Sequence, residues 1–156
     1  MRGDPEIIEL LNEVLTAELT AINQYFIHAK MCDNWGFARL ADKVRDESID
    51  EMKDAEAVIE RILYLEGVPN LQRLGPVKVG EEPIEMHKLD LELELAAVVR
   101  LNKAVDLCLQ KSDAGTRDLV ESVLREEEEA IDWLEAQLGL VEDIGRERYL
   151  AQQLHE

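Results

Sequence analysis

The chain has 156 residues, of which 46% are hydrophobic and only 4% aromatic, and its formal net charge at pH 7 is −18. This length and apolar content suit one compact domain over residues 1–156 and exclude intrinsic disorder. The negative charge argues against nucleic acids and anionic membranes as partners, and it favours cations.

The first helix is expected over residues 4–34, because Asp4 is a suitable N-cap and Pro5 fits the first helical position. A second helix is expected over 37–66, and Gly67 is expected to end it as the C′ residue. The stretch GVPNLQRLGPVKVGEEP that follows is rich in glycine and proline, so it predicts a long crossover connection. Three further helices are expected over 82–111, 116–143 and 146–154.

This order of elements predicts an all-α fold. Short loops join the first helix to the second and the third to the fourth, and one long connection lies between the two pairs. That is the one-crossover four-helix bundle of ferritin-like folds. The short fifth helix is expected to cap the bundle or to pack against neighbouring chains.

Each long helix carries one glutamate near the middle of its apolar stripe, namely Glu18, Glu51, Glu94 and Glu127. Within each helical pair the two glutamates are 33 residues apart, so all four share one register. Buried carboxylates need neutralising partners. The pattern therefore predicts a carboxylate-bridged di-metal site for iron or manganese, unless some of the four reach solvent at the stripe edges. The expected stripes also include Leu91, Val98, Val105, Leu124, Ile131 and Leu138.

The cysteines and histidines do not point to a catalytic or metal site. Cys32 and Cys108 fit neither a disulfide framework nor a zinc spacing, and they predict buried helix-packing thiols. The histidines His28, His87 and His155 are expected at the solvent or at an interface. The start of the chain lacks the apolar core of a signal peptide, and no run approaches the roughly 18 apolar residues of a membrane span. We therefore expect a cytoplasmic protein.

Several stretches together resemble bacterioferritin, the haem-containing bacterial ferritin, over essentially the whole chain: GDPEIIELLNEVLTAELTAINQYFIHAKM, ESIDEMK, AEAVIERILYLEGVPNLQRLG and EEEEAIDWLEAQLGLVEDIG. The resemblance implies a 24-subunit cage that stores hydrated ferric mineral. It also implies a haem b at each two-fold contact, held by one methionine from each of two subunits. The fifth helix would line the four-fold axis.

The family's haem methionine falls on Met52, which by its place alone would be an ordinary core or interface methionine. Met52 directly follows Glu51, so the two side chains point about 100° apart on the helix. Glu51 is therefore expected to face the bundle, while Met52 faces a neighbouring subunit. The resemblance assigns the haem pocket to Leu19, Ile22, Asn23, Phe26 and Ile49.

The family's ferroxidase centre joins the four glutamates to two histidines in Glu-x-x-His motifs on the second and fourth helices. Here the motifs read EMKD and EEEA, so Asp54 and Ala130 stand in the histidine positions. Aspartate is a shorter metal ligand and adds negative charge, whereas alanine binds no metal. The candidate ligands are then Glu18, Glu51, Asp54, Glu94 and Glu127.

Other family positions are matched by polar residues. The inner-surface iron site maps onto Asp46, which replaces a histidine, and Asp50. Pore-lining positions map onto Asn34, Glu66 and Asp132, and a position near the three-fold axis maps onto Asp118. Without the resemblance, the pore candidates Asn34, Glu66, Asp132 and Asp118 are equally well explained as exposed polar residues near helix ends.

Three hypotheses follow from these residues. The first is a haem-bearing iron-storage subunit with a degraded ferroxidase centre, in a homo-24-mer or in a mixed cage with a ferroxidase-competent subunit. A ferredoxin-type donor would then supply electrons through the haem for iron release. The second is an active ferroxidase with a carboxylate-rich site. The third is an acidic helical scaffold that keeps only the fold, and Met52 and the four glutamates argue against it.

Overall fold

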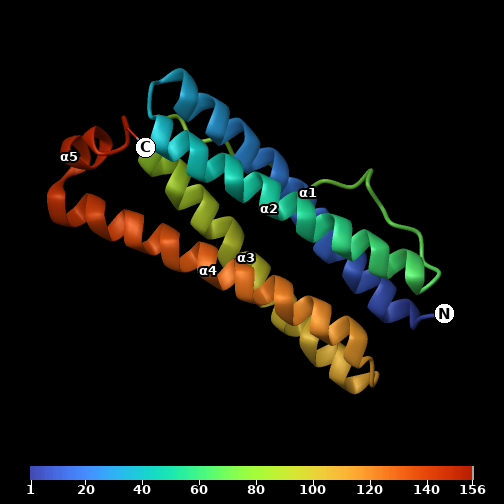
Figure 1. Cartoon of the computed structure of the whole chain (residues 1–156). Coiled ribbons are helices and arrows are strands. Elements are labelled where there is room, and N and C mark those ends of the chain that lie inside the picture. The colour runs from blue at the N-terminus through green and yellow to red at the C-terminus, as the bar shows by residue number, and fades with distance from the viewer. Residues whose placement is uncertain (156) are drawn as a thin grey trace.

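The computed structural model describes residues 1–155, and within them the chain forms four long helices and one short helix, with no strand (Figure 1). The predicted all-α bundle is confirmed. None of the described helices is long and apolar enough to cross a membrane. The helices are α1 (Pro5–Asn34), α2 (Ala38–Tyr64), α3 (Pro83–Gln110), α4 (Ala114–Ile144) and α5 (Arg146–Ala151).

Local sequence signals determine the ends of the first helical pair. The Asp4 carboxylate accepts a hydrogen bond from the Glu6 amide at 2.8 Å and caps α1. The left-handed residue after α2 is Glu66, with φ 63°, so the expectation that Gly67 is the C′ residue was wrong. The Gly67 amide instead bonds the Ile62 carbonyl at 2.9 Å, as in a Schellman motif. Glycine is needed there because a Cβ would lie 2.6 Å from Ile8 Cγ2.

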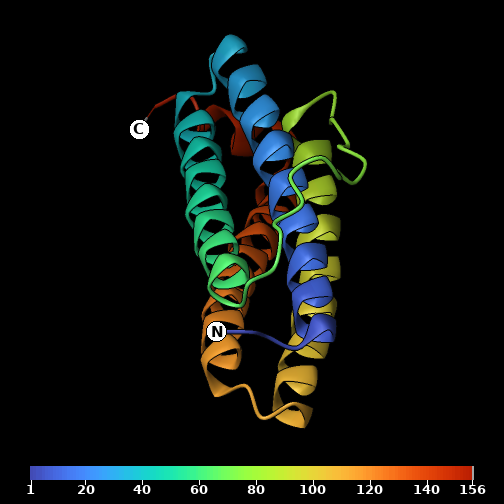
Figure 2. The ribbon, with the colours of Figure 1, turned by 90° about the vertical axis from the view of Figure 1, so that its right-hand side faces the viewer.

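The long helices form two antiparallel pairs, α1 with α2 and α3 with α4, that lie side by side (Figures 1 and 2). The pairs meet mainly through α1 and α3, and much less through α2 and α4. The crossover from α2 to α3 runs along α1 on the outside of the bundle (Figure 2).

A polar ladder on α1 fastens the crossover to the bundle. Its members recur at every fourth residue, so each is a neighbour of the next and the ladder winds slowly around the helix. The Thr20 hydroxyl accepts a hydrogen bond from the Gly75 amide at 2.9 Å, and Gln24 Oε1 accepts one from the Lys78 amide at 3.1 Å. The ladder consists of Asn12, Thr16, Thr20, Gln24 and His28, which bind Asn70, Arg73, Gly75, Lys78 and Gly80 respectively.

Two of the predicted stripes are only partly correct, since Glu94 and Leu101 of α3 and Val120, Glu127 and Leu134 of α4 are buried as expected. In α3 the buried face includes Asp90, Ala97 and Ala104, and in α4 it includes Val123 and Ala130. These positions lie one residue before the predicted ones, and apart from Val123 they are occupied by alanines or by Asp90, which pairs with His28. The residues expected on these stripes that are only half-buried are Leu91, Val98, Val105, Leu124, Ile131 and Leu138.

The short helix α5 caps one end of the bundle. Tyr149 and Leu150 are buried there in a cluster with Cys32, Leu40 and Met86. The carbonyl of Gln153 accepts a hydrogen bond from the Arg39 amide at 3.0 Å, which ties the segment after α5 to the start of α2. Both cysteines are free and buried, as the sequence predicted.

Candidate metal centre

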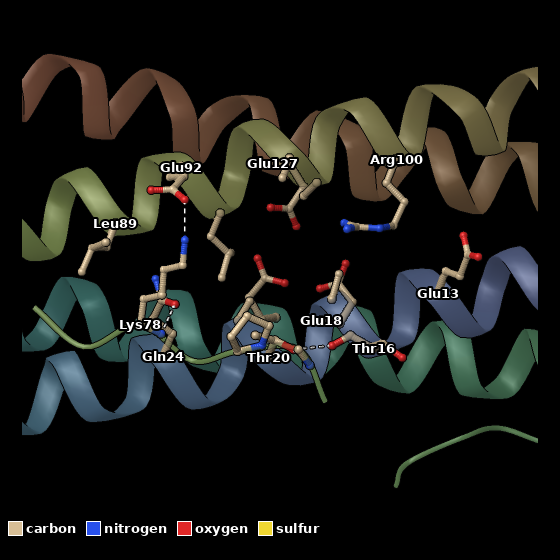
Figure 3. Close-up of a pocket in the computed structure, with 18 residues that line it drawn as sticks. Glu13, Thr16, Glu18, Thr20, Gln24, Lys78, Leu89, Glu92, Arg100 and Glu127 are labelled. Carbon is tan, nitrogen blue, oxygen red and sulfur yellow. Dashed lines mark hydrogen bonds and ion pairs between the residues drawn. The ribbon is translucent and has the colours of Figure 1, made fainter. Parts of the chain in front are cut away.

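Four buried carboxylates from three helices converge in the middle of the bundle. Glu18 comes from α1, Glu51 and Asp54 from α2, and Glu127 from α4, and one oxygen of each lies within 4.8 Å of the others. Figure 3 shows the Glu18 and Glu127 side chains pointing toward one another from opposite helices. We call these four residues the carboxylate centre.

The helical register brings these side chains together. The Ser48 hydroxyl donates a hydrogen bond to the Ile22 carbonyl at 2.9 Å, which fixes α2 against α1 at this level. Ser48, Glu51 and Asp54 are each three residues apart, which is nearly one helical turn, so all three side chains lie on the side of α2 that faces the bundle. The equal spacing of the glutamates within the two pairs then places Glu127 at the same level.

Glu94 lies in the same core but outside the carboxylate centre. It is completely buried, and its Oε1 accepts a hydrogen bond from the Tyr25 hydroxyl at 2.5 Å. Its Oε2 has no hydrogen-bond partner among the described residues. Tyr25 thus orients Glu94 and leaves one oxygen available.

Burial raises the pKa of every carboxyl group in the centre. The pKa of Glu18 rises to about 7, that of Glu127 to about 8 and that of Asp54 to about 10. The pKa of Glu51 also lies well above its usual range, because burial and then the neighbouring carboxylates disfavour its charged form. The centre therefore holds protons near neutral pH, and a bound cation has to displace them.

Two pockets reach the centre from opposite sides. The α1/α3 pocket, of about 240 Å³, lies under the crossover and is lined by Glu18, Glu51 and Glu127 together with Lys78 and Arg100 (Figure 3). The Arg100 side chain extends from α3 toward Glu18 and Glu127 (Figure 3). The α2/α4 pocket, of about 230 Å³, is lined by Lys43, Glu47, Asp50, Glu51, Asp54, Glu126, Glu129 and Ala130.

The expectation that the histidines lie at the solvent or an interface was wrong for two of the three. His28 is completely buried, with Nδ1 3.0 Å from Asp90 Oδ1, and His87 is buried with Nε2 2.9 Å from the Tyr149 hydroxyl. Burial lowers the pKa of His87 to about 4. Both are packed in the core by partners on other helices, and neither belongs to the carboxylate centre. His155 is exposed.

The positions that the resemblance assigns to haem lie on the outer face of α1 and α2. Met52 and Phe26 are 55% and 56% exposed, which is high for large apolar side chains. Because the Ser48 hydroxyl bonds the Ile22 carbonyl and the helices are antiparallel, Met52 lies about one turn further along, near the level of Glu18 and Leu19 on α1. Of the remaining positions, Leu19, Ile22 and Ile49 are half-buried and Asn23 is exposed.

The other predicted positions are all on the surface. Asp50 lines the α2/α4 pocket, and Asp46 lies one turn before it on α2. The four pore candidates are exposed, and two of them, Asp118 and Asp132, lie on α4. The other two are Asn34 and Glu66.

Comparisons with known proteins decide the family. Residues 8–144 match the ferritin-like domain model. Bacterioferritin from Mycobacterium leprae is 49% identical over 152 residues, which cover 97% of this chain and 96% of that protein. This chain belongs to the bacterioferritin family. Its function within that family is iron storage.

Other bacterioferritins agree with this placement. The protein from Streptomyces coelicolor is 50% identical over 97% of this chain and 90% of its own length. The protein from Rhodobacter capsulatus is 43% identical over 93% and 90% respectively. The match covers all four long helices. The carboxylate centre therefore lies within the matched region, and so does the outer face of α1 and α2 that carries Met52, which we call the Met52 face.

Proposed function

We propose that this chain is a haem-bearing subunit of an iron-storing bacterioferritin cage, and that its ferroxidase centre is degraded. The observation that carries the proposal is the ligand set of the carboxylate centre. Asp54 and Ala130 follow Glu51 and Glu127 by three residues, where the family resemblance places histidines. The centre consequently offers oxygen donors and no nitrogen donor.

The electrostatics of the centre support slow iron oxidation. Imidazole is a neutral ligand, whereas Asp54 adds a carboxyl group to three others in a buried space. Ferrous iron, the substrate, must displace protons from groups whose pKa values are raised by burial. Ala130 contributes no donor at all. Both changes weaken metal binding where two iron ions would have to be held together.

The Met52 face fits a haem shared by two subunits. An interfacial haem needs a thioether that is exposed in the single chain and has apolar side chains nearby. Met52 is 55% exposed and lies about one turn from the half-buried Ile49 on α2, which meets that need. Met52 from each of two copies would hold the iron of haem b. When bound, the haem supplies electron transfer to the stored mineral, with a ferredoxin-type protein as the proposed donor.

The proposal also covers assembly and location. The subunit would build a cytoplasmic 24-subunit cage, alone or mixed with a ferroxidase-competent subunit. Asp46 and Asp50 would bind iron at the inner surface, and the exposed pore candidates would line entry routes. They are Asn34, Glu66, Asp118 and Asp132.

A second candidate function is an active ferroxidase with an altered, carboxylate-rich site. The convergence of four carboxylate oxygens within 4.8 Å favours it, because that spacing is suited to a bound cation. Glu94, with one free oxygen, would be a further ligand.

Ferrous iron added in air to the purified homopolymer tests the first candidate against the second. We expect no fast oxidation phase, and we expect the double variant Asp54→His, Ala130→His to gain one that saturates near two iron ions per subunit. The rate is followed by absorbance of the ferric product. A fast phase of that stoichiometry in the unmodified protein would overturn the degraded-centre proposal and favour the second candidate.

A further inference from the structure

One cationic side chain of the α1/α3 pocket has no acidic partner. Arg100 lies on α3 and lines this pocket together with Glu18 and Glu127. The other cation of the lining, Lys78, is 2.6 Å from Glu92 and is neutralised by it. Arg100 forms no ion pair with any carboxylate that the structure describes. Because arginine stays charged at every physiological pH, a permanent positive charge is left without a partner in this pocket.

The guanidinium of Arg100 is directed toward a carboxylate that also has an unpaired oxygen. Figure 3 shows the Arg100 side chain extending from α3 toward Glu18 and Glu127 within the pocket. Glu18 is only 4% exposed, and its Oε2 has no hydrogen-bond partner among the described residues. A buried oxygen without a partner is costly, so a donor or a cation is expected beside it. Of the side chains that line the pocket, Arg100 is the cation that is still available.

The carboxylate centre carries four negative charges when all its groups are ionised. One divalent cation neutralises two of them. A second metal ion would neutralise the rest, but Asp54 and Ala130 stand in the positions where the family resemblance places nitrogen ligands. A guanidinium needs no ligand set of its own, since it binds a carboxylate through two parallel hydrogen bonds. Its fixed charge also repels a second cation at short range.

We propose that Arg100 is a positioning residue that takes the place of a second metal ion at the carboxylate centre. When one divalent cation binds, the Arg100 guanidinium pairs with Oε2 of Glu18, turns the other oxygen of Glu18 to the metal, and limits the centre to that single ion. The inference rests on the proposed function, because it explains how a centre that lacks both histidines balances its charge. The ions that suit such oxygen ligands are Mn²⁺, Mg²⁺ and ferrous iron.

Mn²⁺ binding to the metal-stripped full-length protein tests this inference by electron paramagnetic resonance. The signal of the free ion gives the number of ions bound, and the number lost in Glu18→Gln is the share of the carboxylate centre. Two ions bridged by a carboxylate couple their spins, so the spectrum of a pair differs from that of a single ion. We expect one uncoupled ion per centre in the unmodified protein. In Arg100→Gln we expect a second, spin-coupled ion that binds at least tenfold more tightly than any second ion of the unmodified protein.

Two further variants separate the charge of Arg100 from other effects. Arg100→Lys keeps the positive charge, so its centre should still hold one ion. Lys103→Gln is the matched control, because Lys103 has the same charge and is exposed on the same helix but does not line the pocket. Its centre should also hold one ion. Arg100 is half-buried and unpaired, so its substitutions should leave the fold intact.

A single uncoupled ion in Arg100→Gln would overturn the inference, while the proposed degraded centre would stand. A second ion in Arg100→Lys or in Lys103→Gln would overturn it too, because side-chain shape or net charge alone would then explain the exclusion. A spin-coupled pair in the unmodified protein would contradict both the inference and the degraded centre. If Glu18→Gln loses no Mn²⁺, the carboxylate centre does not bind the ion and the inference fails with it.

Discussion

The protonation of single buried carboxyl groups links the stability of this protein to pH. Glu18 shows this most simply, because burial raises its pKa from 4.5 to about 7. The proton is held in the folded chain at pH values where the unfolded chain has already lost it. The contribution of protonated Glu18 to stability is therefore fully present below pH 4.5 and is lost as the pH rises toward 7.

We predict that Glu18→Gln becomes progressively more stable than the unmodified protein as the pH rises from 5 to 8. Glutamine keeps the shape of the neutral acid but cannot ionise, so it avoids a cost on the order of 3 kcal/mol for a shift of this size. Thermal and urea unfolding of the metal-stripped proteins measure the difference. Glu56→Gln, on an exposed residue of α2, is the control and should give a flat profile. A flat profile for Glu18→Gln as well would contradict the prediction.

Cations should reverse this pH dependence in the unmodified protein. A cation bound only by the folded state stabilises it by mass action, and the carboxylates bind metal only after losing their protons. This connects the raised pKa values to the proposed iron binding, because the groups that cost stability at neutral pH are the candidate metal ligands.

At the scale of the helices, the sequence best predicted the features that follow from the periodic spacing of apolar residues. Glu18, Glu51 and Glu127 converge as expected, because each sits on a stripe whose register follows from helix geometry alone. The buried positions of His28 and His87 were not predictable in this way. Each pairs with a residue 62 positions away, Asp90 and Tyr149 respectively, and no local pattern indicates such a partner.

The polar ladder of α1 was also missed, although its signal is present in the sequence. The polar residues of the ladder recur at every fourth position of α1. They are Asn12, Thr16, Thr20, Gln24 and His28. A polar stripe is usually exposed to solvent, but here the backbone of a non-helical crossover needs acceptors. A glycine- and proline-rich segment beside a helix with such a stripe is the combination that could have predicted it.

We predict that Thr20→Val loosens the crossover at Gly75. The Gly75 amide loses its acceptor in a half-buried position, which should lower the free energy of unfolding by about 1–2 kcal/mol. Hydrogen exchange of a peptide containing Gly75 should speed up. Thr16→Val is the matched control, because its partner is the Arg73 side chain, which water can satisfy. Equal effects of the two substitutions would show that the ladder does not act through the Gly75 amide.

At the scale of the whole molecule, α2 presents one face to the bundle interior and the other to the outside of the subunit. Glu51 is buried in the carboxylate centre, while the next residue, Met52, is 55% exposed. A substitution on the outer face of α2 should therefore leave the carboxylate centre intact. Phe26 on α1 is 56% exposed and is another of the positions that we propose for the haem pocket.

We predict that Met52→Leu abolishes the bis-methionine haem spectrum while the protein keeps its assembled size. Leucine has nearly the volume of methionine, so packing changes little, but it has no sulfur to bind haem iron. Absorbance after reconstitution with haem b gives the haem content, and analytical ultracentrifugation gives the size. Met31→Leu is the control, because Met31 packs against the α5 cluster rather than on this face. A bis-methionine spectrum that survives in Met52→Leu would disprove the assignment, whereas loss of assembly together with haem would make Met52 a packing residue of the subunit contact.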